Sequence, residues 1–143
     1  MGRAVAPRYG SFPTTADVGI WARGKNAAEL FEAAGTGLFA LMTDLRRVRP
    51  REERTISASG PDAPSLLVAF LNELILLQQT EGFLGRRIHA RPLGDPPTSL
   101  LATVSGEVFD PARHTRRKEV KAATFHELLF DVSTRRARVI VDI

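Results

Sequence analysis

The sequence predicts a single α+β domain, residues 1–143, in which two helices pack against one or more layers of mixed or antiparallel β-sheet. Two segments repeat apolar residues every three or four positions, as amphipathic helices do, and the other ordered segments alternate as strands do. Every segment after the second helix is of the alternating kind, which favours an antiparallel or mixed sheet over a doubly wound parallel sheet. The predicted order is β-α-β-α-β-β-β-β.

A strand and a capped helix open this order, after a loose lead-in of residues 1–8. Residues 17–23 alternate apolar and other side chains, so we expect the first strand there. Asn26 and Glu29 have the spacing of a capping box, in which the first residue is the N-cap and the second reaches back to the helix start. The helix that follows is expected to end near Asp44.

The second strand and the second helix follow at once. Residues 54–59 are predicted to form a strand. Asp62 then precedes a proline and a strongly apolar segment, which is typical of an N-cap. The second helix is predicted over residues 65–79, and Gly82 ends it. Because this helix is polar on only a narrow face, we expect it at the centre of the core.

Four strands are predicted in the rest of the chain: residues 86–91, 100–108, 120–132 and 136–143. The third of these is the longest, and His126 falls on its apolar side. We therefore expect His126 to be a satisfied histidine in the core or at its rim. The last two strands are expected to form a hairpin that closes the sheet.

Composition excludes several classes of site. There are no cysteines, which removes disulfides, thiolate zinc sites and cysteine nucleophiles. No secretory signal is recognisable, and the longest apolar stretch, residues 66–77, is too short to span a membrane, so a cytoplasmic location is expected. The net charge of +4 permits an anionic partner such as RNA. The excess of arginine over lysine is explained equally well by genome base composition.

No common catalytic motif is present: the chain has no phosphate-binding glycine loop, no nucleophile elbow and no His-Glu-x-x-His segment. The three histidines stand in different segments without the spacing of a metal site. Near the two ends, however, Asp17 begins a strand and Asp142 precedes Ile143 at the end of another. If these strands meet, two side chains and a terminal carboxylate converge, and they repel one another unless a cation lies between them. The alternative is that Asp142 ends an ordinary solvated strand.

A basic loop, residues 113–118, follows an Asp-Pro turn and begins with Arg113 and His114. Such a loop can dock an acidic partner or a phosphate, although charged hairpin loops are also common at plain surfaces. Lys121, just beyond it, alternates away from the apolar side of its strand. It is either an ordinary surface residue or one directed at a partner.

Several segments, taken in order, resemble the archease family. The matching blocks are residues 15–20, 41–44, 70–74, 106–114, 119–126 and 142–143. Two departures stand out: Thr14 occupies the place of the usual family histidine, and Phe125 replaces the usual tyrosine.

The resemblance implies a non-catalytic cofactor protein that assists an RtcB-type RNA ligase in tRNA splicing and RNA repair, promoting ligase guanylylation and multiple turnover. It also implies a metal site made by Asp17, Asp142 and the terminal oxygens of Ile143. Ca²⁺ is the expected ion, with Mg²⁺ or Mn²⁺ as alternatives.

The basic loop with Arg113 and His114, together with Lys121, is expected to face the ligase or its nucleotide. Asp44 and Glu107 are further candidates on the same face. RNA is expected to be bound indirectly, through the ligase.

Three other functions remain open at this level: a stand-alone RNA-binding module, a chaperone-like adaptor for RNA-modifying enzymes, and a small metal-dependent hydrolase. The net positive charge favours the RNA-binding module, but aromatic residues are few and no aromatic strand pair of the base-stacking type is predicted. The hydrolase lacks a second catalytic constellation.

Overall fold

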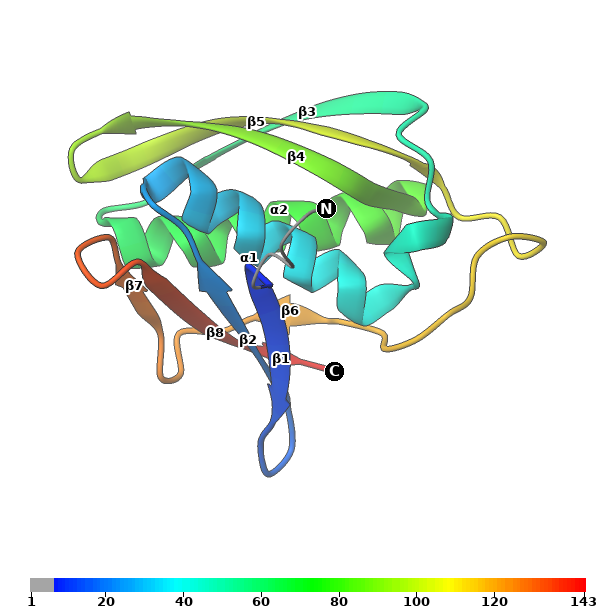
Figure 1. The fold of residues 1–143 in the computed structure, drawn as a ribbon, viewed down its shortest axis with the longest axis horizontal. Coiled ribbons are helices and arrows are strands. Elements are labelled where there is room, and N and C mark those ends of the chain that lie inside the picture. Colours follow the sequence, from blue (N-terminus) through cyan, green and yellow to red (C-terminus); the bar gives the residue numbers. More distant parts are fainter. Residues whose placement is uncertain (1–6) are drawn as a thin grey trace, which may run out of the picture.

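Three layers stack in the structure, a computed structural model that describes residues 7–143. A three-stranded sheet and a five-stranded sheet enclose a central layer of two helices, and both helices contact both sheets (Figure 1). Residues 1–6, most of the predicted lead-in, lie outside the described residues. Neither helix in the described part of the chain combines the length and apolar character that crossing a membrane requires. The predicted single α+β domain is confirmed.

The five-stranded sheet joins the two ends of the described chain. Its order is β1-β2-β8-β6, β7 also pairs with β8, and every pairing is antiparallel. The strands are β1 (Tyr9–Pro13), β2 (Val18–Arg23), β6 (Ala122–Ala123), β7 (Leu129–Asp131) and β8 (Arg136–Asp142). One side of this sheet packs on the helices, and the other side has no layer of secondary structure over it in residues 7–143 (Figure 1).

The three-stranded sheet has the order β3-β5-β4 and is also antiparallel. Its strands are β3 (Glu52–Ser59), β4 (Phe83–Gly94) and β5 (Pro97–Val108). All three predicted strands are present here, and the structure extends each of them. A bulge in β4 lies opposite the end of β5 that leads to the basic loop.

Both helices begin at the predicted N-caps. Helix α1 (Ala27–Met42) starts after Asn26, whose Oδ1 accepts a 2.9 Å bond from the Glu29 N–H. The Glu29 carboxylate reaches back as expected, but it accepts from the N–H of Lys25, the residue before the N-cap, at 2.9 Å. A 3₁₀ turn, η1 (Leu45–Arg47), follows.

Helix α2 (Ala63–Glu81) starts after Asp62, which accepts from the Ser65 N–H at 2.8 Å. It ends at Gly82, whose φ of 69° is the left-handed conformation that favours glycine. The core lies on both sides of the helix layer, and Phe31 and Phe70 meet there edge to face at 5.9 Å. A helix enclosed between two sheets is apolar around most of its circumference, as α2 is.

Two strand predictions were wrong. The predicted strand 120–132 consists of two short strands, β6 and β7, with a loop between them in which Glu127 has a φ of 51°. The apolar alternation continues through this loop although its backbone does not pair as a strand. His126 lies in the loop with 73% of its side chain exposed, so it is not a core or rim histidine. Strand β1, which precedes the first predicted strand, was not predicted.

The N-cap of α1 gives a first test. We expect Asn26→Ala to lower the free energy of unfolding by about 1 kcal/mol, because the Glu29 N–H loses its acceptor. Urea denaturation measures this change, and Asn26→Asp, which restores an acceptor, is the control. An unchanged midpoint for Asn26→Ala would show that the cap contributes nothing to stability.

Candidate functional site

Asp17 and Asp142 lie at the same end of the five-stranded sheet. In the β2–β8 ladder Val18 pairs with Val141, so the same register places the next residues, Asp17 and Asp142, opposite each other. Val18 and Val141 are buried in the core, and side chains alternate along strands, so the two carboxylates belong to the opposite, outer side. Asp17 is half-buried and Asp142 is exposed.

The backbone of Asp17 is fixed by Thr14. The Thr14 hydroxyl accepts the Asp17 N–H at 3.0 Å, and the Thr14 N–H donates to the Asp17 carbonyl at 3.2 Å. These two bonds close the turn between β1 and β2 just before the ladder begins. Thr14 therefore fixes the main chain of Asp17, a role that the sequence analysis did not assign to it.

Lys121 lies at the same sheet end, directly before β6. Its N–H donates to the Asp142 carbonyl at 2.8 Å, and the next residue, Ala122, pairs with Asp142. The Lys121 side chain is exposed. The structure thus brings Asp17, Asp142, Ile143 and Lys121 to one end of the sheet.

The donors at this end suit a hard cation. Within residues 7–143, neither the Asp17 nor the Asp142 carboxylate accepts a hydrogen bond or forms an ion pair, so both have free oxygens. In that range no three histidine, aspartate or glutamate side chains lie close enough together to hold a metal ion. Carboxylate and main-chain oxygens are the ligands that Ca²⁺ and Mg²⁺ prefer.

Asp44 makes local contacts instead. It caps η1, and its carboxylate accepts two bonds from the Arg46 guanidinium, at 2.9 and 3.0 Å. These side-chain hydrogen bonds lower the pKa of Asp44 from 3.8 to about 2. Through these contacts Asp44 organises the chain that follows α1.

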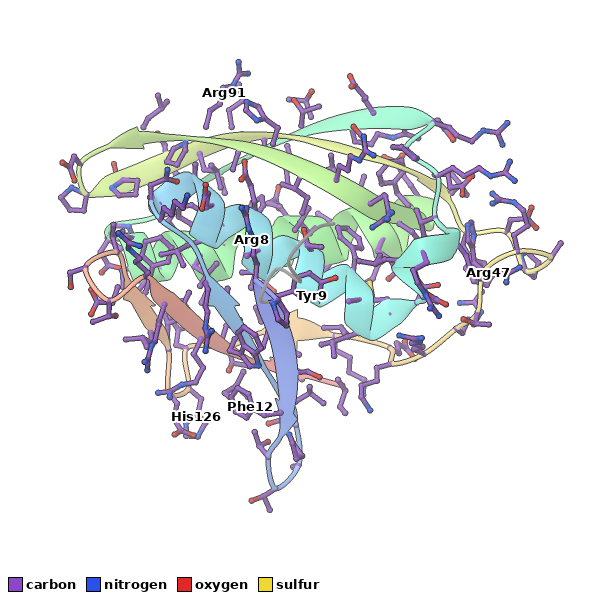
Figure 2. All side chains as sticks on the ribbon, viewed as in Figure 1. Arg8, Tyr9, Phe12, Arg47, Arg91 and His126 are labelled. Atoms are coloured by element: carbon purple, nitrogen blue, oxygen red, sulfur yellow. The ribbon has the colours of Figure 1, made fainter. Side chains whose placement is uncertain are left out.

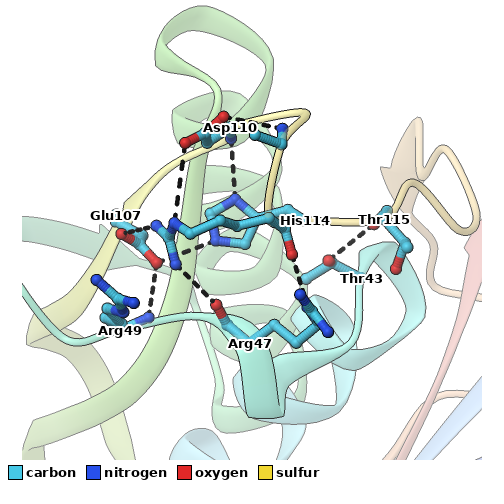
Figure 3. Close-up of polar contacts among 9 residues, drawn as sticks. Thr43, Arg47, Arg49, Glu107, Asp110, His114 and Thr115 are labelled. Atoms are coloured by element: carbon cyan, nitrogen blue, oxygen red, sulfur yellow. Dashed lines mark hydrogen bonds and ion pairs between the residues drawn. The ribbon is translucent and has the colours of Figure 1, made fainter.

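Glu107 and His114 form the centre of a buried polar cluster (Figure 3). They are only 4% and 3% exposed, so neither offers a side chain to a partner. Glu107 accepts from the Arg113 guanidinium, from His114 Nε2 at 3.0 Å and from the Arg49 N–H at 2.8 Å. The cluster thereby joins the start of the basic loop to the segment that follows η1.

The hydrogen bonds define the tautomer of His114 and the charge of Glu107. His114 Nδ1 accepts from the Asp110 N–H at 2.9 Å, so the ring hydrogen is on Nε2, which donates to Glu107. Burial raises the pKa of Glu107, but the bonds from Arg49, Arg113 and His114 outweigh it and lower the pKa from 4.5 to about 2. Glu107 is therefore a fixed anion that holds the loop.

Further along, the basic loop is attached to the end of α1. The N–H groups of Arg117 and Lys118 donate to the carbonyls of Met42 and Leu41, both at 2.9 Å. The Thr43 hydroxyl donates to the Thr115 carbonyl at 2.8 Å, which fixes the loop at a third point (Figure 3). A hollow of about 430 Å³ lies beside the loop, and the exposed side chains of residues 116–118 line it. The structure therefore presents these cationic side chains on an anchored backbone.

The Glu107 cluster predicts a specific pH dependence. Because the folded-state pKa lies below the ordinary value, its stabilisation is present above about pH 4.5 and is lost as the pH falls towards 2. We expect the difference in unfolding free energy between the wild type and Glu107→Gln to be constant near neutral pH and to shrink across that window. Urea denaturation at a series of pH values measures it. A difference that stays constant down to pH 2 would contradict the assignment.

Known proteins resemble this chain over nearly its full length. The sequence profile of the Archease protein family (MTH1598/TM1083) matches residues 9–143. Protein archease of Methanothermobacter thermautotrophicus is 38% identical over 135 residues, covering 92% of this chain and 96% of the relative. That of Thermococcus gammatolerans is 37% identical over 122 residues, covering 85% and 86%.

A solved structure agrees with these matches. The solution structure of Methanobacterium thermoautotrophicum protein 1598 superposes with a TM-score of 0.81 at 36% identity, covering 96% of this chain and all of that one. Sequence and fold therefore lead to the same assignment: the chain belongs to the archease family.

Proposed function

We propose that this protein is a metal-binding, non-catalytic cofactor that activates an RtcB-type RNA ligase in tRNA splicing and RNA repair. Its family membership supports a role beside such a ligase. The observation that carries the metal part of the proposal is the β2–β8 register, which places Asp17 opposite Asp142 beside the last residue.

In this proposal Asp17, Asp142 and the main-chain oxygens of Ile143 hold one divalent cation. When bound, such a cation supplies positive charge that stabilises phosphate oxygens during nucleotidyl transfer to the ligase. The turn made by Thr14 orients Asp17, and the Lys121 N–H orients the Asp142 main chain. Three protein oxygens leave further coordination positions for groups of the partner.

The exposed part of the basic loop and Lys121 are proposed to face the ligase or its nucleotide. The loop and Lys121 both carry exposed cationic side chains. Because the loop backbone is anchored at α1, its side chains are already positioned to contact an anionic surface. The buried Glu107–His114 pair acts on this surface indirectly, by fixing the start of the loop.

We assign no catalytic group to this chain. Both ring nitrogens of His114 are engaged, by the Asp110 N–H and by Glu107, so His114 is not free to act as a general base. The chemistry is therefore proposed to take place on the ligase, and this protein supplies charge and orientation.

The test is ligation with limiting cognate RtcB-type ligase, GTP, Mn²⁺ and excess RNA ends, with and without this protein. We expect ligation to rise from a single round per ligase to many rounds when the protein is present. Unchanged ligation would refute the proposed function.

A further inference from the structure

The outer side of the five-stranded sheet contains a groove that the proposed function does not use. Its volume is about 390 Å³, within the range of small-ligand sites. Strands β1, β2, β7 and β8 line it, and its larger side chains are Phe12, Trp21, Arg23, Leu129, Arg136 and Arg138. Aromatic and cationic side chains thus share one open surface, and the opposite side of the sheet packs on the helices.

The two aromatic rings lie flat on neighbouring strands. Trp21 pairs with Gly10, and Phe12 pairs with Gly19, across the same β1–β2 ladder. A Cβ atom on either glycine would overlap the opposing ring, so each ring rests where the glycine leaves room. Both rings are half-buried, which fixes their orientation and keeps part of each ring accessible. Two aromatic rings on neighbouring strands are thus held on one surface, an arrangement that the sequence analysis did not predict.

Arginines surround these rings. The Arg23 guanidinium lies 5.3 Å from the centre of the Trp21 ring, and Arg23 pairs directly with Arg136 across β2 and β8. Like charges directly opposite each other in a sheet repel, and a bound anion relieves that repulsion. Arg138 is held over the same side because its Nε donates to the Glu127 carbonyl at 3.0 Å.

Positive charge extends beyond the groove. A neighbouring hollow of about 690 Å³ shares Arg23 and Arg136 with it and adds Arg8, Lys25 and Arg135. Among the described residues that line the two hollows, Glu29 is the single acidic side chain. The surface therefore carries a net excess of cationic side chains.

We propose that this outer sheet surface binds single-stranded RNA directly, with bases stacked on Trp21 and Phe12 and phosphates paired with Arg23, Arg136 and Arg138. Base faces are available for stacking only in unpaired nucleic acid, and aromatic rings beside cations on an open sheet are the usual way of binding it. Residues 136, 138, 140 and 142 lie on the same side of β8 because side chains alternate along a strand. An RNA strand bound along β8 would therefore lead towards Asp142. RNA would thus be held by this chain itself, which goes beyond the proposed function.

Trp21 is the single tryptophan of the chain and reports on the groove directly. We would follow its fluorescence while adding an oligouridylate of about eight nucleotides, without ligase or metal ions. Saturable quenching is expected, with a slope of log affinity against log salt of about −2 if three phosphates are neutralised. Duplex RNA and base-free polyphosphate serve as comparisons, and each should quench far less.

Matched variants locate the site. Phe12→Ala should weaken binding by about 5- to 100-fold, the effect of one lost base stack. Arg136→Gln should weaken it and reduce the salt slope by about 0.7, whereas Arg91→Gln should change neither. Arg91 makes the same charge change but projects from β4 on the far side of the molecule from Phe12 (Figure 2). Trp21→Phe, followed with labelled RNA, should retain binding that Trp21→Ala loses.

Three results would overturn the proposal. The first is no quenching by the single-stranded oligomer, and the second is equal quenching by polyphosphate. The third is unchanged RNA affinity in both Phe12→Ala and Arg136→Gln, which would place the bound RNA outside the groove. Since neither ligase nor metal is present in the RNA titration, failure there leaves the proposed ligase activation to be judged by its own assay.

Discussion

Replacing Asp17 with asparagine is expected to abolish stimulation of the ligase while the protein stays folded. The variant removes one of two carboxylates at the sheet end, and metal affinity should fall by more than about 100-fold, since residues that only orient metal ligands already contribute about 10- to 100-fold. Folding should be preserved because the Asp17 side chain makes no hydrogen bond within residues 7–143, and the Thr14 bonds use only its main chain.

Two measurements separate metal binding from activation. Calorimetric titration with Ca²⁺ and Mn²⁺ gives the affinity, and ligation with limiting ligase gives the number of rounds. Glu53→Gln, the same change of charge at an exposed position of β3, should leave both unchanged. If Asp17→Asn binds metal weakly but stimulates normally, the cation is not needed for activation; if it retains full affinity, the site lies elsewhere.

The largest loss of stability is expected for Glu107→Ala, about 3 kcal/mol. The change leaves the buried His114 Nε2–H, the Arg113 guanidinium and the Arg49 N–H without their acceptor. Removing one partner of a buried charged pair costs more than the pair itself contributes, because the remaining groups have already lost their hydration.

Urea denaturation measures this loss, and hydrogen exchange shows where it acts. Protection should decrease at the amides of Arg117 and Lys118, which attach the basic loop to α1. Glu119→Ala, in the same segment but exposed, is the control and should change little. If Glu107→Ala loosened the loop no more than the control did, the cluster would not be what holds it.

The helices were predictable because their ends carry local chemistry. Asn26, Asp62 and Gly82 each satisfy main-chain groups within a few residues, so their effect can be read from neighbouring sequence. Strands lack such signals: the alternation from residue 120 to 132 continues through a loop, and β1 is short and contains a glycine and a proline. Missing β1 also hid the placement of the Phe12 and Trp21 rings on neighbouring strands, where each ring lies over a glycine of the other strand.

For the candidate site, the residues at strand ends were easier to predict from the sequence than the buried polar cluster was. The sequence analysis made the convergence of Asp17 and Asp142 depend on the pairing of their two strands, and β2 does pair with β8. His114 was expected to face a partner as part of the basic loop, and Glu107 was a further candidate on the same face, but both are buried. Their burial depends on Arg49 and Arg113, partners distant from one another in sequence whose convergence only the tertiary fold creates.

The pairing of β2 with β8 has a consequence for synthesis on the ribosome. The middle of the chain, with both helices and the three-stranded sheet, emerges before β8 has been made, and long-range strand pairing is slow because the chain must first close a large loop. The neighbourhood of Asp17 and Asp142, and the groove beside Trp21, exist only once β8 docks. A chain interrupted before β8 would therefore lack both surfaces.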